Sequence, residues 1–261
     1  LKFTADSGDL TLRGLTITGG RTTSSLDAGG GINFDGSGVL TIDRSTVSGN
    51  SVGGGTASGG GIYAYDGDVT LTSSTVSGNR TGSYGGGIYT SSGAVTLTGS
   101  TLSGNSSSND GGGLFTRSGA VTLANSTVSG NSSSNDGGGI YTDDSTVRVL
   151  NSTITNNTAV GRAGGIGLLP DNIGDERLIV RNSIVARNTD TSTAPDILAP
   201  GDPANDLTVD YSLIGNTTGS GVTASTGTGN LLNVNPMLGP LSDNGGPTLT
   251  RALLAGSPAI N

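Results

Sequence analysis

A segment of about 26 residues recurs along this chain, and the recurrence limits its fold more than any other feature. Each copy ends in an asparagine: VLTIDRSTVSGN ends at Asn50, and similar stretches end at Asn79, Asn105, Asn131, Asn157 and Asn188. A Gly-Gly-Gly triplet recurs in the same phase, followed by an aliphatic residue at Ile32, Ile62, Ile88, Leu114 and Ile140. Two marks with one period are typical of a solenoid, in which each repeat stacks on the next.

Within each copy, apolar residues alternate with Thr or Ser, as in Val69-Thr70-Leu71, which is the period of a half-buried β-strand. Such short strands cannot bury a core alone, but they can pair in parallel with neighbouring copies about 4.8 Å away. We therefore predict an all-β fold, a right-handed single-stranded parallel β-helix with rungs of about 26 residues. Residues 1–216 form the repeat rungs, and residues 217–261 form the final rungs and a capping tail of the same domain.

Stacking predicts which residues share a column. The inward aliphatic columns should contain Leu40, Val69, Val95, Val121 and Val147; Ile42, Leu71, Leu97, Leu123 and Val149; and Val47, Val76, Leu102, Val128 and Ile154. Because unpaired buried hydroxyls are costly, an inward serine ladder is expected at Ser45, Ser74, Ser100, Ser126, Ser152 and Ser183. The repeat-ending asparagines should form a second ladder at a bend, where their amides satisfy backbone groups.

Composition narrows the classes of partner. The 261 residues carry a net charge of -8, which repels nucleic-acid phosphates and anionic lipid surfaces. No apolar run approaches the roughly 20 residues of a membrane-spanning helix. We therefore expect no nucleic-acid partner and no membrane insertion. The chain has no cysteine, which excludes disulfides.

The two marks resemble the repeats of chlamydial polymorphic outer-membrane proteins and related bacterial surface β-helices. The tail NPMLGPLSDNGGPTLTRALLAGSPAIN, residues 235–261, is similar to the segment that closes the β-helix in many large secreted bacterial repeat proteins. Val76, Leu102 and Val128 stand where the chlamydial pattern prefers Phe, and no autotransporter barrel sequence follows. The resemblance implies a secreted or surface-exposed bacterial protein of an adhesive or structural kind, and it does not carry membrane insertion with it.

One region has the residue types that a polysaccharide-degrading enzyme would need. Asp143 and Asp144 precede one strand and Asp175 and Glu176 precede the next, and Arg148 and Arg181 occupy outward positions of the following strands. The acidic oxygens could bind Ca²⁺, and the arginines could neutralise an acidic sugar. The alternative is a solvated turn edge whose charges prevent sideways aggregation. The chain has no histidine, and Lys2 is its one lysine, which limits the available acids and bases.

Three further patterns bear on binding. Tyr63, Tyr89, Phe115 and Tyr141 follow the inward aliphatic residue and should face outward as an aromatic ribbon, which could stack on sugar rings or stabilise neighbouring rungs. Asp110 and Asp136, one rung apart, either share a cation or point into water. Thr-X-Thr pairs in successive rungs resemble ice-binding β-solenoids, although Thr is also simply a good exposed strand residue.

Two hypotheses for function follow. The first is a noncatalytic extracellular or cell-surface scaffold, structural or adhesive, without a cofactor, that associates end to end as a filament subunit or binds other surface proteins or glycans. The second is a polysaccharide-binding or lyase-like enzyme that uses the acidic edge and Ca²⁺. End-to-end association is expected wherever unpaired strand edges at a terminal rung lack a cover.

Overall fold

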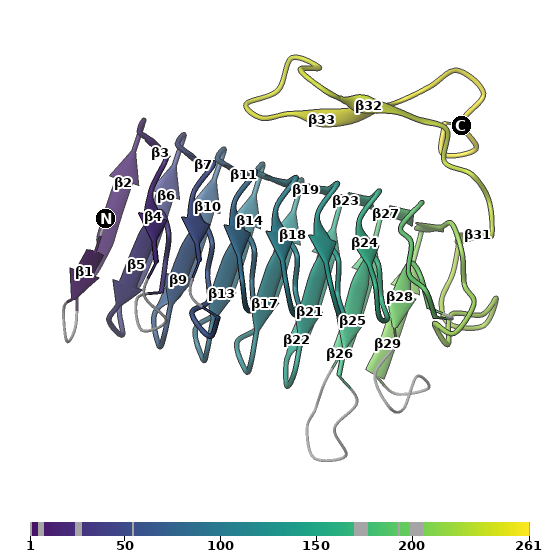
Figure 1. Cartoon of the computed structure of the whole chain (residues 1–261). Coiled ribbons are helices and arrows are strands. Elements are labelled where there is room, and N and C mark those ends of the chain that lie inside the picture. Colours follow the sequence, from purple (N-terminus) through teal and green to yellow (C-terminus); the bar gives the residue numbers. More distant parts are fainter. Residues whose placement is uncertain are drawn as a thin grey trace.

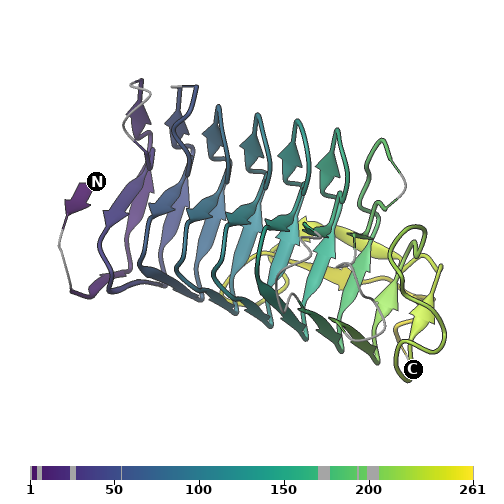
Figure 2. The same cartoon turned by 90° about the horizontal axis from the view of Figure 1, so that it is seen from below.

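The computed structural model describes residues 2–4, 8–23, 28–53, 55–169, 177–192, 194–198 and 206–260. In this part of the chain, short strands return to the same sides of the molecule in successive turns, and the turns stack into an elongated rod (Figures 1 and 2). The stacked sides form four parallel sheets, here called sheets A to D. Within the described ranges, no helix is long and apolar enough to cross a membrane.

Sheets A and B carry most of the aliphatic core. Sheet A consists of β1 (Lys2–Thr4), β5 (Ile32–Asp35), β9 (Ile62–Ala64), β13 (Ile88–Thr90), β17 (Leu114–Thr116), β21 (Ile140–Thr142), β25 (Ile166–Leu168) and β28 (Ile197–Leu198). Sheet B consists of β2 (Leu10–Arg13), β6 (Val39–Asp43), β10 (Asp68–Thr72), β14 (Val95–Thr98), β18 (Val121–Ala124), β22 (Thr146–Leu150), β26 (Arg177–Arg181) and β29 (Leu207–Asp210).

Sheets C and D complete each turn. Sheet C consists of β3 (Thr16–Thr18), β7 (Thr46–Ser48), β11 (Thr75–Ser77), β15 (Thr101–Ser103), β19 (Thr127–Ser129), β23 (Thr153–Thr155), β27 (Ile184–Ala186), β30 (Leu213–Ile214) and β31 (Leu231–Leu232). Sheet D consists of β4 (Arg21–Thr22), β8 (Ser51–Val52), β12 (Arg80–Thr81), β16 (Ser106–Ser107), β20 (Ser132–Ser133) and β24 (Thr158–Ala159).

The register confirms the predicted inward columns. Leu71 pairs with Leu97 and Leu97 with Leu123, and all three side chains have no exposed surface. The three predicted columns belong to one continuous aliphatic cluster. Since side chains alternate between the faces of a strand, this register leaves Thr70 and Thr96 on the outer face, where they are half-buried. The prediction of a parallel β-solenoid is therefore confirmed, with 26 residues between equivalent positions such as Asn79 and Asn105.

Two polar ladders join the rungs, as predicted. In the serine ladder, the backbone N–H of each serine donates to the hydroxyl of the next, as from Ser74 to Ser100 at 3.1 Å. In the asparagine ladder, the Asn79 backbone N–H and Nδ2 both donate to Asn105 Oδ1 at 3.0 Å. Asn79, Asn105 and Asn131 each begin an Asn-X-Ser/Thr triplet, the acceptor sequence for N-glycosylation. All three are at most 1% exposed, so they cannot accept a glycan in the folded chain.

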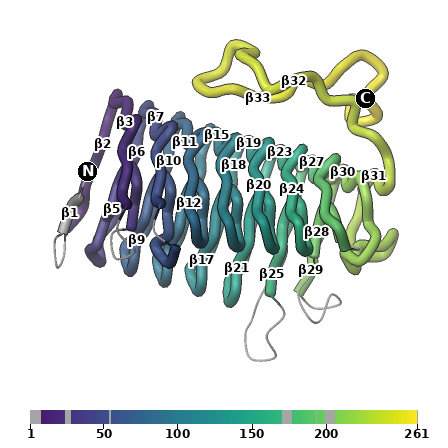
Figure 3. Tube along the Cα trace, in the orientation of Figure 1, coloured from purple at the N-terminus to yellow at the C-terminus, as the bar shows by residue number. Residues whose placement is uncertain are grey.

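The segment after β30 has two parts. Residues 217–230 lie against the last strand of sheet B, where Val222 joins the aliphatic core and Asn230 Nδ2 donates to the carbonyl of Val209 at 2.6 Å. Beyond β31, an antiparallel hairpin of β32 (Leu238–Ser242) and β33 (Thr250–Leu253) turns back along the rod (Figures 1 and 3). The first part therefore covers the end of the core, whereas the hairpin lies on a side of the rod.

Hydrogen bonds place this hairpin on the outer face of sheet C. Thr101 Oγ1 donates to the carbonyl of Leu249 at 2.7 Å, and Arg251 Nε donates to Ser129 Oγ at 2.9 Å. Arg187 Nη1 donates to the carbonyl of Leu238 at 3.2 Å. The outward side chains of Thr101 and Ser129 are consequently buried.

Candidate functional site

Four of the charged residues considered for catalysis lie in the described part of the chain: Asp143, Asp144, Arg148 and Arg181. Arg148 pairs in register with Ile179, whereas Arg181 pairs with Leu150, so the two arginines stand in different columns of sheet B. Arg181 Nε lies 3.3 Å from Asp210 Oδ2. Arg148 and Arg181 are therefore diagonal neighbours on adjacent strands, and both are exposed.

The structure describes one of the two acidic pairs that precede the strands of sheet B. Asp143 and Asp144 lie in the turn between β21 and β22, and Arg117 Nε is 3.9 Å from Asp143 Oδ2. Asp175 and Glu176 lie outside the described residues. Among the residues that the structure does describe, no group of three or more His, Cys, Asp or Glu side chains could hold a metal ion.

The aromatic column lies outside the aliphatic core but is mostly buried. Tyr89, Phe115 and Tyr141 are at most 6% exposed, and Tyr63 is half-buried. Successive ring centroids from Tyr63 to Tyr141 are 5.2, 5.7 and 6.2 Å apart. Burial is the main reason that the pKa of Tyr63 is raised to about 12. The four rings face away from the aliphatic core and three of them are buried, which favours the alternative in which the rings stabilise neighbouring rungs.

Neighbouring side chains and backbone cover the aromatic rings. The Tyr84 ring, from the turn before β13, packs on Phe115 with centroids 4.8 Å apart. The glycine corners fold the backbone against the rings, since a Cβ added at Gly111 would lie 2.6 Å from Phe115 Cβ. Neither contact follows from strand alternation, which predicts only which face a side chain occupies.

Asp110 and Asp136 form a polar cluster outside the two ladders. Asp136 Oδ2 accepts from Arg162 Nη2 at 2.7 Å and from the Tyr141 hydroxyl at 3.2 Å. Asp110 Oδ1 accepts from Asn135 Nδ2 at 2.7 Å and from the Asp136 backbone N–H at 2.9 Å. Burial raises the pKa of Asp110 above its usual value. Most of these contacts join side chains and backbone of adjacent rungs, so the cluster stabilises the stacking of one rung on the next.

A buried carboxylate that sequence reasoning missed continues the asparagine ladder. Asp196 is 1% exposed, and its Oδ1 accepts from Asn188 Nδ2 at 2.8 Å and from the Asn188 backbone N–H at 3.0 Å. Its Oδ2 accepts from the Asn216 backbone N–H at 2.7 Å. Burial, only partly offset by these hydrogen bonds, raises the pKa of Asp196 to about 6. Asp196 comes 8 residues after Asn188, out of phase with the repeat, so periodicity could not reveal it.

Three depressions of the described surface are considered as candidate binding sites. A pocket of about 400 Å³ lies between the last rungs and the tail, lined in part by Tyr211, Leu231 and Leu253. A second, of about 330 Å³, lies beside Asp190. A third, of about 230 Å³, lies over the hydroxyl-rich strands of sheet D. Asp143, Asp144, Arg148 and Arg181 line none of these three.

Comparison with known proteins bears on the fold. A family model described as a right handed beta helix region matches residues 30–235. Searches of curated proteins and of solved structures found no match.

Proposed function

This chain belongs to the right-handed β-helix family, and from that premise we propose that it is a noncatalytic extracellular scaffold with a structural or adhesive role. The observation that carries the proposal is the continuity of the rod. Four parallel sheets and two hydrogen-bonded ladders join each rung to the next. Such a stack holds its outer faces at a fixed spacing, which suits a scaffold that presents surfaces to partners.

The charged groups support a noncatalytic role. An inverting glycosidase needs two carboxylates about 6.5–9.5 Å apart with room for water between them. Asp136 is instead bound by Arg162 and Tyr141, and Arg181 pairs with Asp210. Each of these two carboxylates pairs with an arginine of the neighbouring rung.

We also propose that the protein is extracellular or on the cell surface and that it associates with other copies of itself. The resemblance to bacterial surface β-helices supports a place outside the cell. End-to-end self-association through the edge strands of a terminal rung is the proposed partner interaction. Other surface proteins and glycans are the alternative partners.

Incubation with polysaccharides tests this function. The chain is mixed with acidic and neutral polysaccharides, with and without Ca²⁺, and unsaturated products are followed by ultraviolet absorbance and new chain ends by a reducing-sugar assay. A scaffold releases no product under either condition. Release of unsaturated sugar that depends on Arg148 or Arg181 would overturn the noncatalytic proposal in favour of a lyase.

A further inference from the structure

The bend that follows each strand of sheet B has an unusual residue in the last rung. The residue after each strand of sheet B has a positive φ, and we call these residues the corner column: Gly14, Arg44, Ser73, Gly99, Asn125, Asn151, Asn182 and Tyr211. Glycine and asparagine tolerate this left-handed conformation, whereas a bulky side chain pays a steric cost. Tyr211, with φ of 48°, is the aromatic member of the column.

The Tyr211 ring is both exposed and fixed in place. Tyr211 is 66% exposed, the highest value among the large hydrophobic residues on the described surface. The ring packs on Gly229, where an added Cβ would lie 2.5 Å from Tyr211 Cδ1. The Tyr211 backbone N–H donates to the carbonyl of Thr228 at 2.8 Å. A strained backbone that presents a supported aromatic ring to solvent points to a role beyond folding.

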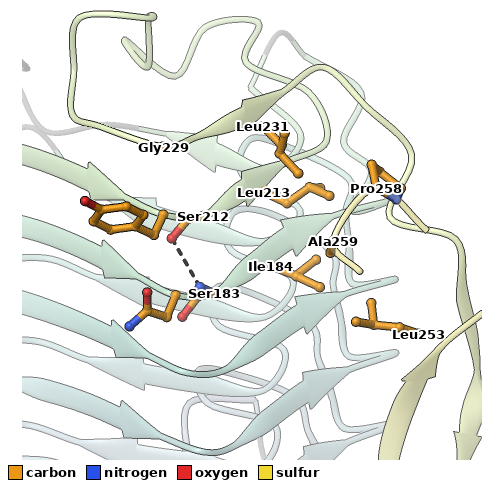
Figure 4. Close-up of a pocket in the computed structure, with 11 residues that line it drawn as sticks. Ser183, Ile184, Ser212, Leu213, Gly229, Leu231, Leu253, Pro258 and Ala259 are labelled. Carbon is orange, nitrogen blue, oxygen red and sulfur yellow. Dashed lines mark hydrogen bonds between the residues drawn. The ribbon is translucent and has the colours of Figure 1, made fainter. Parts of the chain in front are cut away.

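The pocket of about 400 Å³ opens beside this ring. Figure 4 shows Ile184, Leu213 and Leu231 on the strand side and Leu253, Pro258 and Ala259 on the tail side. The strand-side residues share one outward column of sheet C, which in the earlier rungs consists of Thr16, Thr46, Thr75, Thr101, Thr127 and Thr153. The column therefore changes from hydroxyl to aliphatic where the pocket forms.

The lining indicates the chemistry of a ligand. The described residues around the pocket carry no charged side chain, so a neutral ligand is favoured. Leu231 and Leu253 supply exposed apolar surface, and the Asn182 amide can both donate and accept hydrogen bonds. A sugar ring combines an apolar C–H face, which suits an aromatic ring, with hydroxyls that both donate and accept. The volume falls within the range of about 300–1,000 Å³ that is usual for ligand sites.

We propose that the pocket between the last rungs of sheet C and the C-terminal tail binds a neutral oligosaccharide, with one sugar ring stacked on Tyr211 and its hydroxyls bonded to Asn182. This inference deepens the adhesive role proposed above and rests on it. The proposed sugar contact is thus Tyr211, at the exposed end of the corner column, and not the mostly buried aromatic column from Tyr63 to Tyr141.

The corner column supplies variants that separate binding from folding. Glycine is the residue best suited to a positive φ, so Tyr211→Gly and Asn182→Gly remove the two side chains without new backbone strain. Tyr65→Ala is the matched control, because Tyr65 is 48% exposed and does not line the pocket. Isothermal titration calorimetry is run on the full chain with cello-, laminari-, manno-, xylo- and chito-hexaose, and with galacturonate hexamers as the charged comparison.

The expected result is that at least one neutral hexamer binds with Kd below roughly 1 mM. Tyr211→Gly should weaken that binding by at least about fivefold, as expected for a lost aromatic contact. Tyr65→Ala should leave it unchanged. Absence of binding by every neutral hexamer, preference for the galacturonate hexamer, or unchanged affinity in Tyr211→Gly would each overturn the inference. None of these results involves cleavage, so they are distinguishable from the lyase activity that would overturn the scaffold proposal.

Discussion

Replacing one asparagine of the ladder tests how the rungs are held together. Asn105 has no exposed surface and its side chain makes four hydrogen bonds. Oδ1 accepts from the backbone N–H and from Nδ2 of Asn79, each at 3.0 Å. Nδ2 donates to the carbonyl of Val76 at 3.0 Å and to Asn131 Oδ1 at 2.9 Å. Asn105→Ala removes all four in the middle of the rod.

The magnitude follows from these contacts. A buried hydrogen bond contributes about 1 kcal/mol net, and a buried group left unpaired costs about 1–3 kcal/mol. Four lost bonds therefore predict a decrease of about 4 kcal/mol in the free energy of unfolding. Asn105→Asp keeps the shape but places a carboxylate against the carbonyl of Val76 and Asn131 Oδ1. It should destabilise the chain at least as much as alanine does at neutral pH.

The assay is guanidinium unfolding followed by far-ultraviolet circular dichroism, with the free energy obtained by linear extrapolation. Ser108→Ala is the control, because Ser108 is an exposed residue three positions along the same chain segment. The control should lie within about 0.5 kcal/mol of the natural sequence. If the free energy of unfolding of Asn105→Ala differs from that of Ser108→Ala by less than about 1 kcal/mol, the asparagine ladder does not hold the rungs together.

Three further predictions concern the core, pH and assembly. Leu97→Asp should lower the free energy of unfolding by at least about 3 kcal/mol more than Thr96→Asp in the same unfolding assay, because Leu97 is fully buried and Thr96 lies on the outer face; equal values would show that the strand parity is inverted. Asp196 has a folded-state pKa of about 6 against a usual value of 3.8, so the folded chain binds this proton more tightly and the free energy of unfolding should fall by up to about 3 kcal/mol as pH rises from about 4 through 6. Asp196→Asn should flatten that dependence in unfolding curves taken across this pH range, and an unchanged slope would contradict the assignment. The 261-residue chain should sediment as larger species at higher concentration and show end-to-end rods in negative stain, whereas monomers at every concentration would exclude self-association through the edge strands.

The period of the sequence was enough to predict the core and the ladders, because stacking makes one rung determine the next. Val69, Val95, Val121 and Val147 pair in register as the alignment requires. The same logic placed the buried serines and asparagines, since a polar residue repeated at an inward position must find its partner in the neighbouring rung.

Features that depend on segments outside the period could not be predicted in this way. The cover over Phe115 comes from Tyr84 and from close backbone approach at Gly111, and the hairpin on sheet C comes from the nonrepeating tail. Asp196 enters the ladder from a turn. Tyr211 did leave a signal: LTVDYSLIGN aligned on LIVRNSIVARN places Tyr211 where the preceding rung has Asn182, at a position that needs a positive φ.

The chain is a stiff stack of rungs, and a distance along one outer column tests this stiffness most directly. Thr11 and Thr208 lie in the same column of sheet B, linked through Thr41, Thr70, Thr96, Thr122, Arg148 and Ile179. At about 4.8 Å for each step, their Cα atoms should be about 34 Å apart. Because the chain has no cysteine, Thr11→Cys with Thr208→Cys can be spin-labelled specifically and measured by double electron–electron resonance. A narrow distance distribution near this value is the predicted result, and a broad distribution or a maximum far from about 34 Å would contradict the account.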